Sequence, residues 1–278
     1  MPMIAKNYNI FILGTVRNVE KTIIKDIENL KNFTKDFNKS YFYLAESDSD
    51  DRTIGILKKL KRENSNFSYA TFGTLRNKYP LSSVRISLCR NYLVKWLKSQ
   101  KNLKKSLALV VDLDGVNTKI DNTALLNSLH DLENWDAIFA NQHPYYDIWA
   151  LRASNWSDTD CWQEFARLKT QMNEKDALRI AVTSKQISLK TKEKYFPVKS
   201  AFGGLGVYKA EHYIKGKYSG IMNGHHVCEH VPFHKQLVKN GSRLFIRTDL
   251  MNTPPKEHIE TTIKKIKNFL AKIWHLKK

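Results

Sequence analysis

The chain has 278 residues and carries 46 Lys and Arg against 27 Asp and Glu, which gives a formal net charge of +19. Apolar residues make up 42% of it and aromatic residues 11%, with only 11 Gly and 7 Pro, so the composition excludes a disordered or fibrous protein and predicts a folded core. No apolar run reaches the roughly 18 residues of a membrane span, and the start of the chain shows no secretion signal.

Strand-like apolar runs alternate with helical patterns in the first part of the chain. The run 8–16 is followed by Ile23, Ile27, Leu30 and Phe33, the spacing of an amphipathic helix. The same alternation predicts strands at 41–45, 67–72 and 107–111, and helices at 52–60 and 84–97. Continuous apolar strands between helices are typical of a mostly parallel sheet with helices on both faces. We therefore predict a Rossmann-type α/β architecture in a single domain.

The second part of the chain is less regular, and its segments are predicted as follows. Helices are expected near 124–129, 159–171 and 234–240, strands at 137–140 and 243–246, and a loop at 185–199 before the glycine-rich stretch 201–208. Pro254 and Pro255 end the main domain, 1–253, and the segment 254–278 has an apolar stripe among lysines. This pattern predicts a basic amphipathic helix, which either packs on the domain or lies on an anionic membrane surface.

Cysteine usage and charge distribution limit the location and the partners. The three cysteines, Cys89, Cys161 and Cys228, lack paired metal-ligand spacing, which favours a reducing, cytoplasmic location. Lysines concentrate at 185–217 and in the last segment, and both stretches attract anions such as phosphate-rich small molecules, a membrane surface or nucleic acid. Because no helix-turn-helix, zinc-finger or RNP pattern is present, we expect no nucleic-acid partner.

The stretch VVDLDGVN, 110–117, carries the strongest chemical pattern. Asp112 and Asp114 flank Leu113 directly after a buried strand. Ligands of open α/β sheets bind beyond the carboxyl ends of the strands, and carboxylates there suit Mg²⁺ or Mn²⁺ bound to substrate phosphates. Two enzyme classes use this pattern: nucleotide-sugar glycosyltransferases of the GT-A type, and haloacid-dehalogenase-like phosphatases. The phosphatase nucleophile normally follows the first strand, whereas Asp112 follows several βα units, which favours the transferase.

Other polar residues follow the first two predicted strands. Thr15, Arg17 and Asn18 stand where the first strand opens into a helix, and backbone N–H groups and a cation at such a point can meet a nucleotide. Glu46 ends the second strand, where an acid can bind a ribose or a base. The nearby Asp48, Asp50 and Asp51 are interpreted as turn and helix-capping residues.

Arg85 and Arg90 begin the helix that leads into the Asp112 strand. A guanidinium fork is suited to a diphosphate. Residues five apart on a helix point about 140° apart, so we expect only one of the two to face the cleft.

Read in order, seven motifs resemble the capsule-associated mannosyltransferase-like glycosyltransferases, family 69 in the carbohydrate-enzyme classification, over residues 8–250. They are RNVEKTI (17–23), LAESDSDDRT (44–53), VRISLCRN (84–91), VVDLDGVN (110–117), YYDIWALR (145–152), VKSAFGGLGVYKAEHY (198–213) and CEHVPFHKQLVKNGSRLFI (228–246). The resemblance implies a GT-A fold, with Asp112 and Asp114 at the metal and donor-diphosphate site.

The resemblance also implies roles for residues in the second half of the chain. Tyr146, Asp147, Trp149 and Arg152 are expected to line the sugar and acceptor side. Gly203 and Gly204 lack a Cβ and are expected to let the backbone come close to donor or acceptor. Glu229 is the expected general base, which takes the proton of the acceptor hydroxyl in an inverting reaction. Either His230 or His234 is expected to contact the substrate's diphosphate or to complete the metal shell, with His234 the candidate for the metal and His230 the candidate for the substrate.

The leading hypothesis is a metal-dependent hexosyltransferase that uses Mn²⁺ or Mg²⁺ and a UDP- or GDP-linked sugar. It would act on a glycan or lipid-linked acceptor in surface polysaccharide synthesis, in the cytoplasm or peripherally at an anionic membrane. The alternatives are a haloacid-dehalogenase-like phosphatase that uses Asp112 and Asp114, and a basic nucleic-acid-binding protein.

Overall fold

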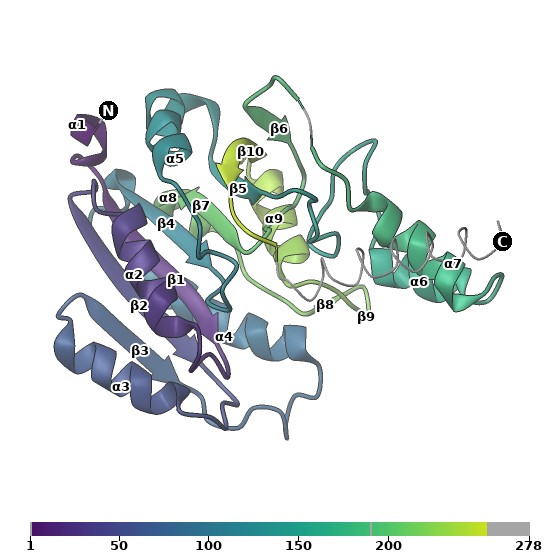
Figure 1. Cartoon of the computed structure of the whole chain (residues 1–278), viewed down its shortest axis with the longest axis horizontal. Coiled ribbons are helices and arrows are strands. Elements are labelled where there is room, and N and C mark those ends of the chain that lie inside the picture. The colour runs from purple at the N-terminus through teal and green to yellow at the C-terminus, as the bar shows by residue number, and fades with distance from the viewer. Residues whose placement is uncertain (1, 190, 255–278) are drawn as a thin grey trace, which may run out of the picture.

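The computed structural model describes residues 2–189 and 191–254, and most strands of this part of the chain join one eight-stranded sheet (Figure 1). The order across the sheet is β3-β2-β1-β4-β7-β5-β10-β6. The strands are β1 Asn9–Val16, β2 Lys39–Glu46, β3 Phe67–Thr71, β4 Ser106–Val111, β5 Ala137–Asn141, β6 Tyr195–Pro197, β7 Leu205–Lys209 and β10 Leu244–Met251, with β8 Ile221–Met222 and β9 His225–His226 forming a separate hairpin.

The sheet is mostly parallel. β3, β2, β1 and β4 pair in parallel, whereas β7 runs antiparallel between β4 and β5. β10 is parallel to β5, and the short edge strand β6 is antiparallel to β10. Only β7 and β6 therefore run against the common direction within the described sheet. The predicted α/β sheet flanked by helices is confirmed.

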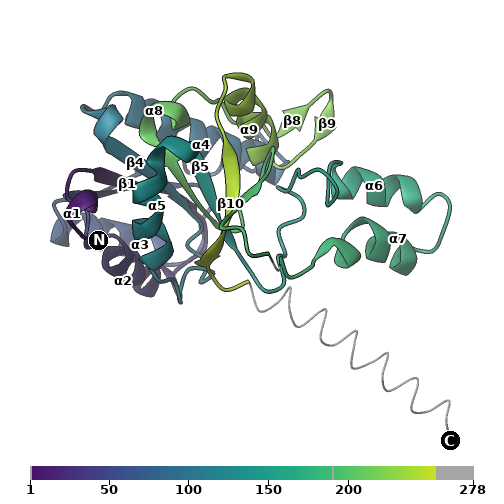
Figure 2. The ribbon, with the colours of Figure 1, turned by 90° about the horizontal axis from the view of Figure 1, so that it is seen from above.

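Helices cover both faces of the sheet (Figure 2). They are α1 Pro2–Ala5, α2 Ile23–Phe33, α3 Thr53–Glu63, α4 Ser82–Lys98, α5 Thr123–Ser128, α6 Cys161–Leu168, α7 Glu174–Ala181, α8 Ala210–Tyr213 and α9 His230–Lys239, with short 3₁₀ turns at Leu103–Lys105, Leu129–Asn134 and Thr183–Lys185. Helices α4, α8 and α9 pack on one face, and α2, α3 and α5 pack on the other. The hairpin α6–α7 stands away from the sheet.

Strand β1 shows why the sheet has two cores. Phe11 and Leu13 belong to the core under α4 and α9, while Ile10 and Ile12 belong to the core under α2 and α3. Successive strand residues point to opposite faces, so a strand covered on both sides must be apolar throughout. The continuous apolar runs in the sequence are the consequence.

Several predicted elements need correction. The helix predicted at 159–171 is the shorter α6, and α7 was not predicted. Helix α9 begins four residues earlier than expected, at His230, and β10 continues to Met251. The predicted loop 185–199 contains β6. These elements are short or polar, so their periodicity is weak, and it is packing against the sheet that sets their limits.

The predicted amphipathic segment 254–278 lies outside the described residues from 255 onward. Across 2–189 and 191–254, no helix combines the length and the apolar character needed to cross a membrane.

Candidate active site

A pocket of about 290 Å³ lies where β1, β2 and β4 end and α4 begins. The chain passes from β1 outward through β2 and β3 and then returns to β4 on the other side of β1. Ligands of open α/β sheets bind at such a reversal of strand order, beyond the carboxyl ends of the strands. The walls include Thr15 near the end of β1, Arg17 directly after β1, Asp48 after β2, Arg85 of α4, and the turn that follows β4.

The turn after β4 presents Asp112, Leu113 and Asp114 to this pocket. All residues of β4 are buried, so the chain leaves the core at Val111. The Asp112 N–H donates to the Gly204 carbonyl at 2.9 Å, and Asn117 Nδ2 donates to the Asp112 carbonyl at 2.9 Å. The Asp112 side chain is 31% exposed and Asp114 lies at the surface. The turn is therefore fixed through its backbone while its carboxylates face the opening.

Arg90 lies behind Asp112 and connects it to Glu229. Its Nε donates to Glu229 Oε1 at 3.0 Å, and its Nη2 donates to Asp112 Oδ1 at 3.4 Å. The guanidinium carbon lies 5.1 Å from the ring centre of Phe202 and 5.7 Å from that of Tyr218, so aromatic faces enclose the cation. Burial disfavours the charged form, but Glu229, Tyr218 and Asp112 raise the pKa of Arg90 above its ordinary value.

The arginines of α4 thus divide as their helical spacing predicts. Arg85 lines the pocket, and its Nε pairs with Asp48 at 3.2 Å. Arg90 has 3% of its side chain exposed and does not line the pocket. The predicted diphosphate contact of Arg90 is corrected, because the aromatic cage holds its guanidinium between two acids.

Several acids act on one another around Asp112. Burial raises the pKa of Asp112; Arg90 opposes the rise, whereas Asp114, Glu229 and Asp147 add to it. Neighbouring carboxylates of this kind are suited to a divalent cation, and hard oxygen ligands suit Mg²⁺ or Mn²⁺. Within the described residues, no three His, Cys, Asp or Glu side chains are arranged to hold a metal by themselves. The donor set therefore fits a cation that takes its other ligands from a diphosphate and water.

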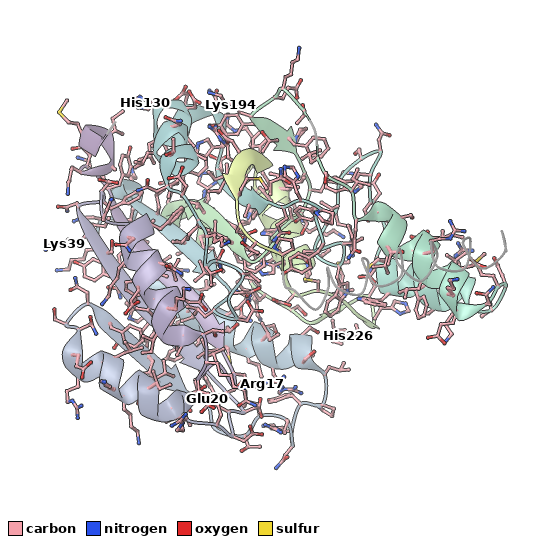
Figure 3. The ribbon with its side chains drawn as sticks, viewed as in Figure 1. Arg17, Glu20, Lys39, His130, Lys194 and His226 are labelled. Atoms are coloured by element: carbon pink, nitrogen blue, oxygen red, sulfur yellow. The ribbon has the colours of Figure 1, made fainter. Side chains whose placement is uncertain are left out.

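The loop after β1 differs from the predicted helix start. Helix α2 begins only at Ile23, and the exposed Arg17 lies in the preceding turn, at the edge of the molecule where β1 ends (Figure 3). Asn18 has a φ of 53° and joins this turn to the loop after β2: its Nδ2 donates to Asp50 Oδ1 at 2.8 Å, and the Asp50 N–H donates to Asn18 Oδ1 at 2.9 Å. Thr15 and Arg17 reach the main pocket, whereas Asn18 fixes the loops.

The prediction for Glu46 is corrected by its surroundings. Glu46 is completely buried, and its Oε1 accepts the Ser49 N–H at 2.9 Å while its Oε2 accepts the Thr71 hydroxyl. Both oxygens therefore serve the loop after β2 and do not face the pocket. The adjacent loop residue Asp48 lines the pocket instead.

Asp48 lies in the turn after β2 with a φ of 63°, as predicted, and it is also a buried ion-pair residue. It accepts the Arg76 N–H at 2.8 Å and pairs with Arg85. Burial acts to raise the pKa of Asp48, but the Arg76 N–H, the Ser47 hydroxyl and Arg85 lower it overall. The pocket wall thus contains an ionised carboxylate that orients Arg85.

The segment 145–152 brings two predicted residues toward the acids. Burial raises the pKa of Tyr146 well above its ordinary value, and Asp147, Asp112 and Asp114 act in the same direction. Asp147 accepts the Gly203 N–H at 3.0 Å. Trp149 packs edge to face on His226 of β9, with ring centres 5.2 Å apart. Figure 3 shows His226 on the same lower side of the molecule as Arg17.

Arg152 has a structural environment, and its predicted sugar contact is corrected. It is 8% exposed, its Nη2 donates to Asp160 Oδ2 at 2.9 Å, and its Nη1 donates to the Leu151 carbonyl at 2.7 Å. Asp160 also caps α6 by accepting the N–H groups of Trp162 and Gln163. The pair therefore anchors the start of the α6–α7 hairpin.

Gly203 and Gly204 are internal and do not lie on a ligand-facing surface. Their φ angles are 64° and 80°, which glycine adopts readily, and a Cβ on Gly204 would lie 2.7 Å from Val116. Gly204 accepts the Asp112 N–H, and Gly203 donates its own N–H to Asp147. The expected approach to donor or acceptor is replaced by a positioning role for both acids.

His230 and His234 are both buried and neutral. His234 Nδ1 lies 2.9 Å from Ser200 Oγ and its Nε2 lies 2.8 Å from Tyr208 Oη, so neither nitrogen is available to a metal and the predicted metal role is corrected. Burial and then Arg90 lower the pKa of His234 to about 3. His230 is 1% exposed, stacks on Phe202 with ring centres 3.9 Å apart and does not line the pocket, so its predicted substrate contact is corrected.

Sequence reasoning missed two buried polar residues beside the turn. Asn117 donates to the carbonyls of both Asp112 and Gly204, and no periodic pattern marks it. Asp26 accepts the Gly115 N–H at 3.1 Å. The sequence feature that could have identified Asp26 is the presence of an acid within the apolar stripe of a predicted helix.

No family model matches this sequence, and no curated protein matches it significantly. Among solved structures, TarS 1–349 of S. aureus in complex with UDP-GlcNAc is 13% identical with a TM-score of 0.49, covering 89% of this chain and 59% of that one. Mannosyltransferase PcManGT from Pyrobaculum calidifontis, in complex with GDP-Man and Mn²⁺, is 12% identical with a TM-score of 0.46, covering 88% and 56%.

The glucosyl-3-phosphoglycerate synthase of M. tuberculosis is 11% identical with a TM-score of 0.41, covering 86% of this chain and 67% of its own. The present chain spans 60% of the length of TarS 1–349 and 36% of the longer TarS chain.

Proposed function

We propose that this chain is a metal-dependent glycosyltransferase that moves a hexosyl group from a UDP- or GDP-linked donor to a glycan or lipid-linked acceptor. The observation that carries the proposal is the pocket at the reversal between β1 and β4, with Asp112 and Asp114 at its mouth. A nucleotide fits such a crevice, and the neighbouring carboxylates there match a cation shared with a diphosphate.

Each wall of the site has a separate task in this proposal. Thr15 and Arg17 bind the nucleotide side, and Arg85, held by Asp48, faces the same space. When bound, Mn²⁺ or Mg²⁺ supplies charge neutralisation for the leaving diphosphate. Asp112 and Asp114 are the residues that hold it. Tyr146, Asp147 and Trp149 form the sugar and acceptor side.

Glu229 is the proposed general base. Its Oε1 is bound by Arg90, and its Oε2 lies 3.9 Å from the Cys228 thiol. In an inverting reaction the acceptor oxygen attacks the anomeric carbon, its proton passes to Glu229, and the bond from that carbon to the diphosphate oxygen breaks. In a retaining reaction Glu229 is a binding residue instead.

The proposals for the biosynthetic role and the location of the protein rest on the sequence. Surface polysaccharide synthesis and a cytoplasmic, peripheral membrane location are proposed from the resemblance and from the lysine-rich segment 254–278. No nucleic-acid partner is proposed.

A donor screen tests the function. Purified protein is mixed with Mn²⁺ or Mg²⁺ and a panel of UDP- and GDP-sugars, and melting temperature and released nucleoside diphosphate are followed. One donor should stabilise the protein in the presence of metal. Asp112→Asn should lower kcat/KM for that donor by at least about a hundredfold, since a metal ligand contributes several kcal/mol to the transition state.

The matched control is Asp121→Asn, which changes an exposed acid before α5 that does not line the pocket. Its activity per folded molecule should equal that of the wild type. If no donor stabilises the protein, and phosphomonoesters are hydrolysed in a reaction that requires Asp112, the transferase is contradicted in favour of the phosphatase.

A further inference from the structure

Asp26 is an acid in the otherwise apolar buried face of α2. The other buried members of that face are Ile23, Ile27, Leu30 and Phe33, which pack in the core under α2 and α3. Asp26 is 0% exposed, and its Oδ1 has no hydrogen-bond partner. A buried polar oxygen without a partner costs folding free energy. A leucine would therefore suit the core better at this position.

The other oxygen of Asp26 reaches the turn that carries the pocket acids. The Gly115 N–H donates to Asp26 Oδ2 at 3.1 Å, across 89 residues of sequence. Thr22 in the preceding turn donates its hydroxyl to the Leu113 carbonyl at 2.8 Å, across 91 residues. Residues at the start of α2 therefore form hydrogen bonds with the residue before Asp114 and with the residue after it.

Gly115 is the residue at which the chain reverses after Asp114. Its φ of 97° is accessible to glycine and strained for other residues. The N–H that Asp26 accepts therefore belongs to the residue that directly follows Asp114 and has the positive φ of the turn. Asp26 also interacts electrostatically with Asp114. Burial raises the pKa of Asp26 to about 6; the hydrogen bond from the Gly115 N–H lowers this pKa, and the negative charge of Asp114 raises it further.

We propose that Asp26 is a positioning residue, which holds the 112–115 turn from α2 so that Asp112 and Asp114 are preorganised for a divalent cation and a nucleoside diphosphate. Asp26 does not line the pocket, so it acts through Gly115. The inference rests on the proposed function, since it names what orients that site. Burying the Asp26 carboxylate costs folding free energy, and in return the 112–115 turn is better ordered.

The first test uses metal-free protein and measures amide hydrogen exchange at Gly115. Asp26→Leu removes the acceptor but fills the core, so the Gly115 amide should exchange at least about tenfold faster while the melting temperature stays the same or rises. Asp26→Asn keeps an acceptor oxygen and should protect the amide nearly as well as the wild type. Glu28→Leu makes the same kind of change on the exposed face of α2 and serves as the control.

The second test measures the Mn²⁺ concentration that gives half of the thermal stabilisation in the presence of UDP or GDP. That concentration should rise roughly 10- to 100-fold in Asp26→Leu, as for other residues that orient metal ligands, and should change little in Asp26→Asn or Glu28→Leu. An unchanged Gly115 exchange rate, or an unchanged Mn²⁺ midpoint, in Asp26→Leu would overturn the inference.

The two proposals fail in distinguishable ways. If the wild type itself shows no stabilisation by Mn²⁺ with either nucleotide, the metal-dependent function fails. The exchange rate of Gly115 still decides, in that case, whether Asp26 holds the turn.

Discussion

The two walls around Asp112 are built in opposite ways. The open wall consists of Thr15 near the end of β1 and of Arg17 and Asp114 on the loops after β1 and β4, and the side chains of Arg17 and Asp114 lie at the surface. The closed wall consists of Arg90 and Glu229, whose side chains are 3% and 7% exposed and are enclosed by aromatic rings and neutral histidines. Asp112, 31% exposed, stands between them.

The difference separates the residues proposed to bind the nucleotide from the buried charges around the proposed base Glu229. Side chains on the open wall can exchange water for a nucleotide at little cost to the fold. Groups on the closed wall have already lost their water, so their charges depend on each other and on burial. Changes in the closed wall should therefore act first on stability, and changes in the open wall on affinity.

The largest effect is expected for Arg90→Met. This change leaves the Glu229 carboxylate buried without its cation, and breaking one side of a buried ion pair costs about 3–5 kcal/mol. Urea unfolding should show this loss directly. The double variant Arg90→Met with Glu229→Gln should recover part of it, because no uncompensated charge remains.

The same two variants test whether the closed wall depends on its charges more than the open wall does. If Arg90→Met alone loses less than about 1 kcal/mol, the closed wall is no more charge-dependent than an exposed ion pair. The double variant also keeps the test meaningful if the single variant fails to fold.

An intermediate effect is expected from pH on His234. Its folded pKa of about 3 lies below the ordinary value of 6.5, so the neutral form is the folded one. The resulting stability is complete above about pH 6.5 and is lost as pH falls from there toward 3, at up to about 1.4 kcal/mol per pH unit. In His234→Gln the free energy of unfolding should fall less steeply between pH 6.5 and 4.

Chemical unfolding at several pH values measures this slope. His225→Gln is the control, because this exposed histidine on β9 stays in water in both states. A slope in His234→Gln equal to that of the wild type would show that burial of His234 does not contribute to acid sensitivity.

The smallest effect is expected for Arg17→Ala on the open wall. Stability should change by no more than about 0.5 kcal/mol, as for other surface substitutions. Affinity for the nucleoside diphosphate found in the donor screen should fall roughly five- to tenfold, which corresponds to about 1 kcal/mol. Calorimetric titration measures it, with Lys58→Ala on the exposed face of α3 as the control.

An affinity loss as large for Lys58→Ala as for Arg17→Ala would mean that net charge, and not the position of Arg17, attracts the anion. A melting temperature lowered by Arg17→Ala would remove the distinction between the two walls.

Much of the fold followed from local patterns. The strands at 9–16 and 106–111 are buried on both faces, so their apolar runs are continuous and easily read. The position of Asp112 and Asp114 followed as well, because residues directly after such a strand must lie at the carboxyl edge of the sheet. Helix α7 and strand β6 were missed, since short elements leave little periodicity.

The predicted site residues also differ in whether local sequence or tertiary neighbours determine their role. Arg17 is placed by its strand alone, and the structure puts it in the pocket. Glu46, Arg152 and His234 have residue types that suit a ligand, but other protein groups already bind them. The partners are Ser49 and Thr71 for Glu46, Asp160 for Arg152, and Ser200 and Tyr208 for His234. Residue type shows what a side chain can bind, and neighbours decide what remains for it to bind.

The sequence by itself determined the alternation of strands and helices, the buried strands and the edge at which the acids emerge, because these depend on periods of a few residues. The tertiary structure decided that Arg90 faces two acids, that Asp26 reaches Gly115 and that Gly203 and Gly204 connect Asp147 to Asp112. Each of these contacts joins segments far apart in the chain. Burial then fixes their charges, since desolvation and long-range partners have no local sequence signal.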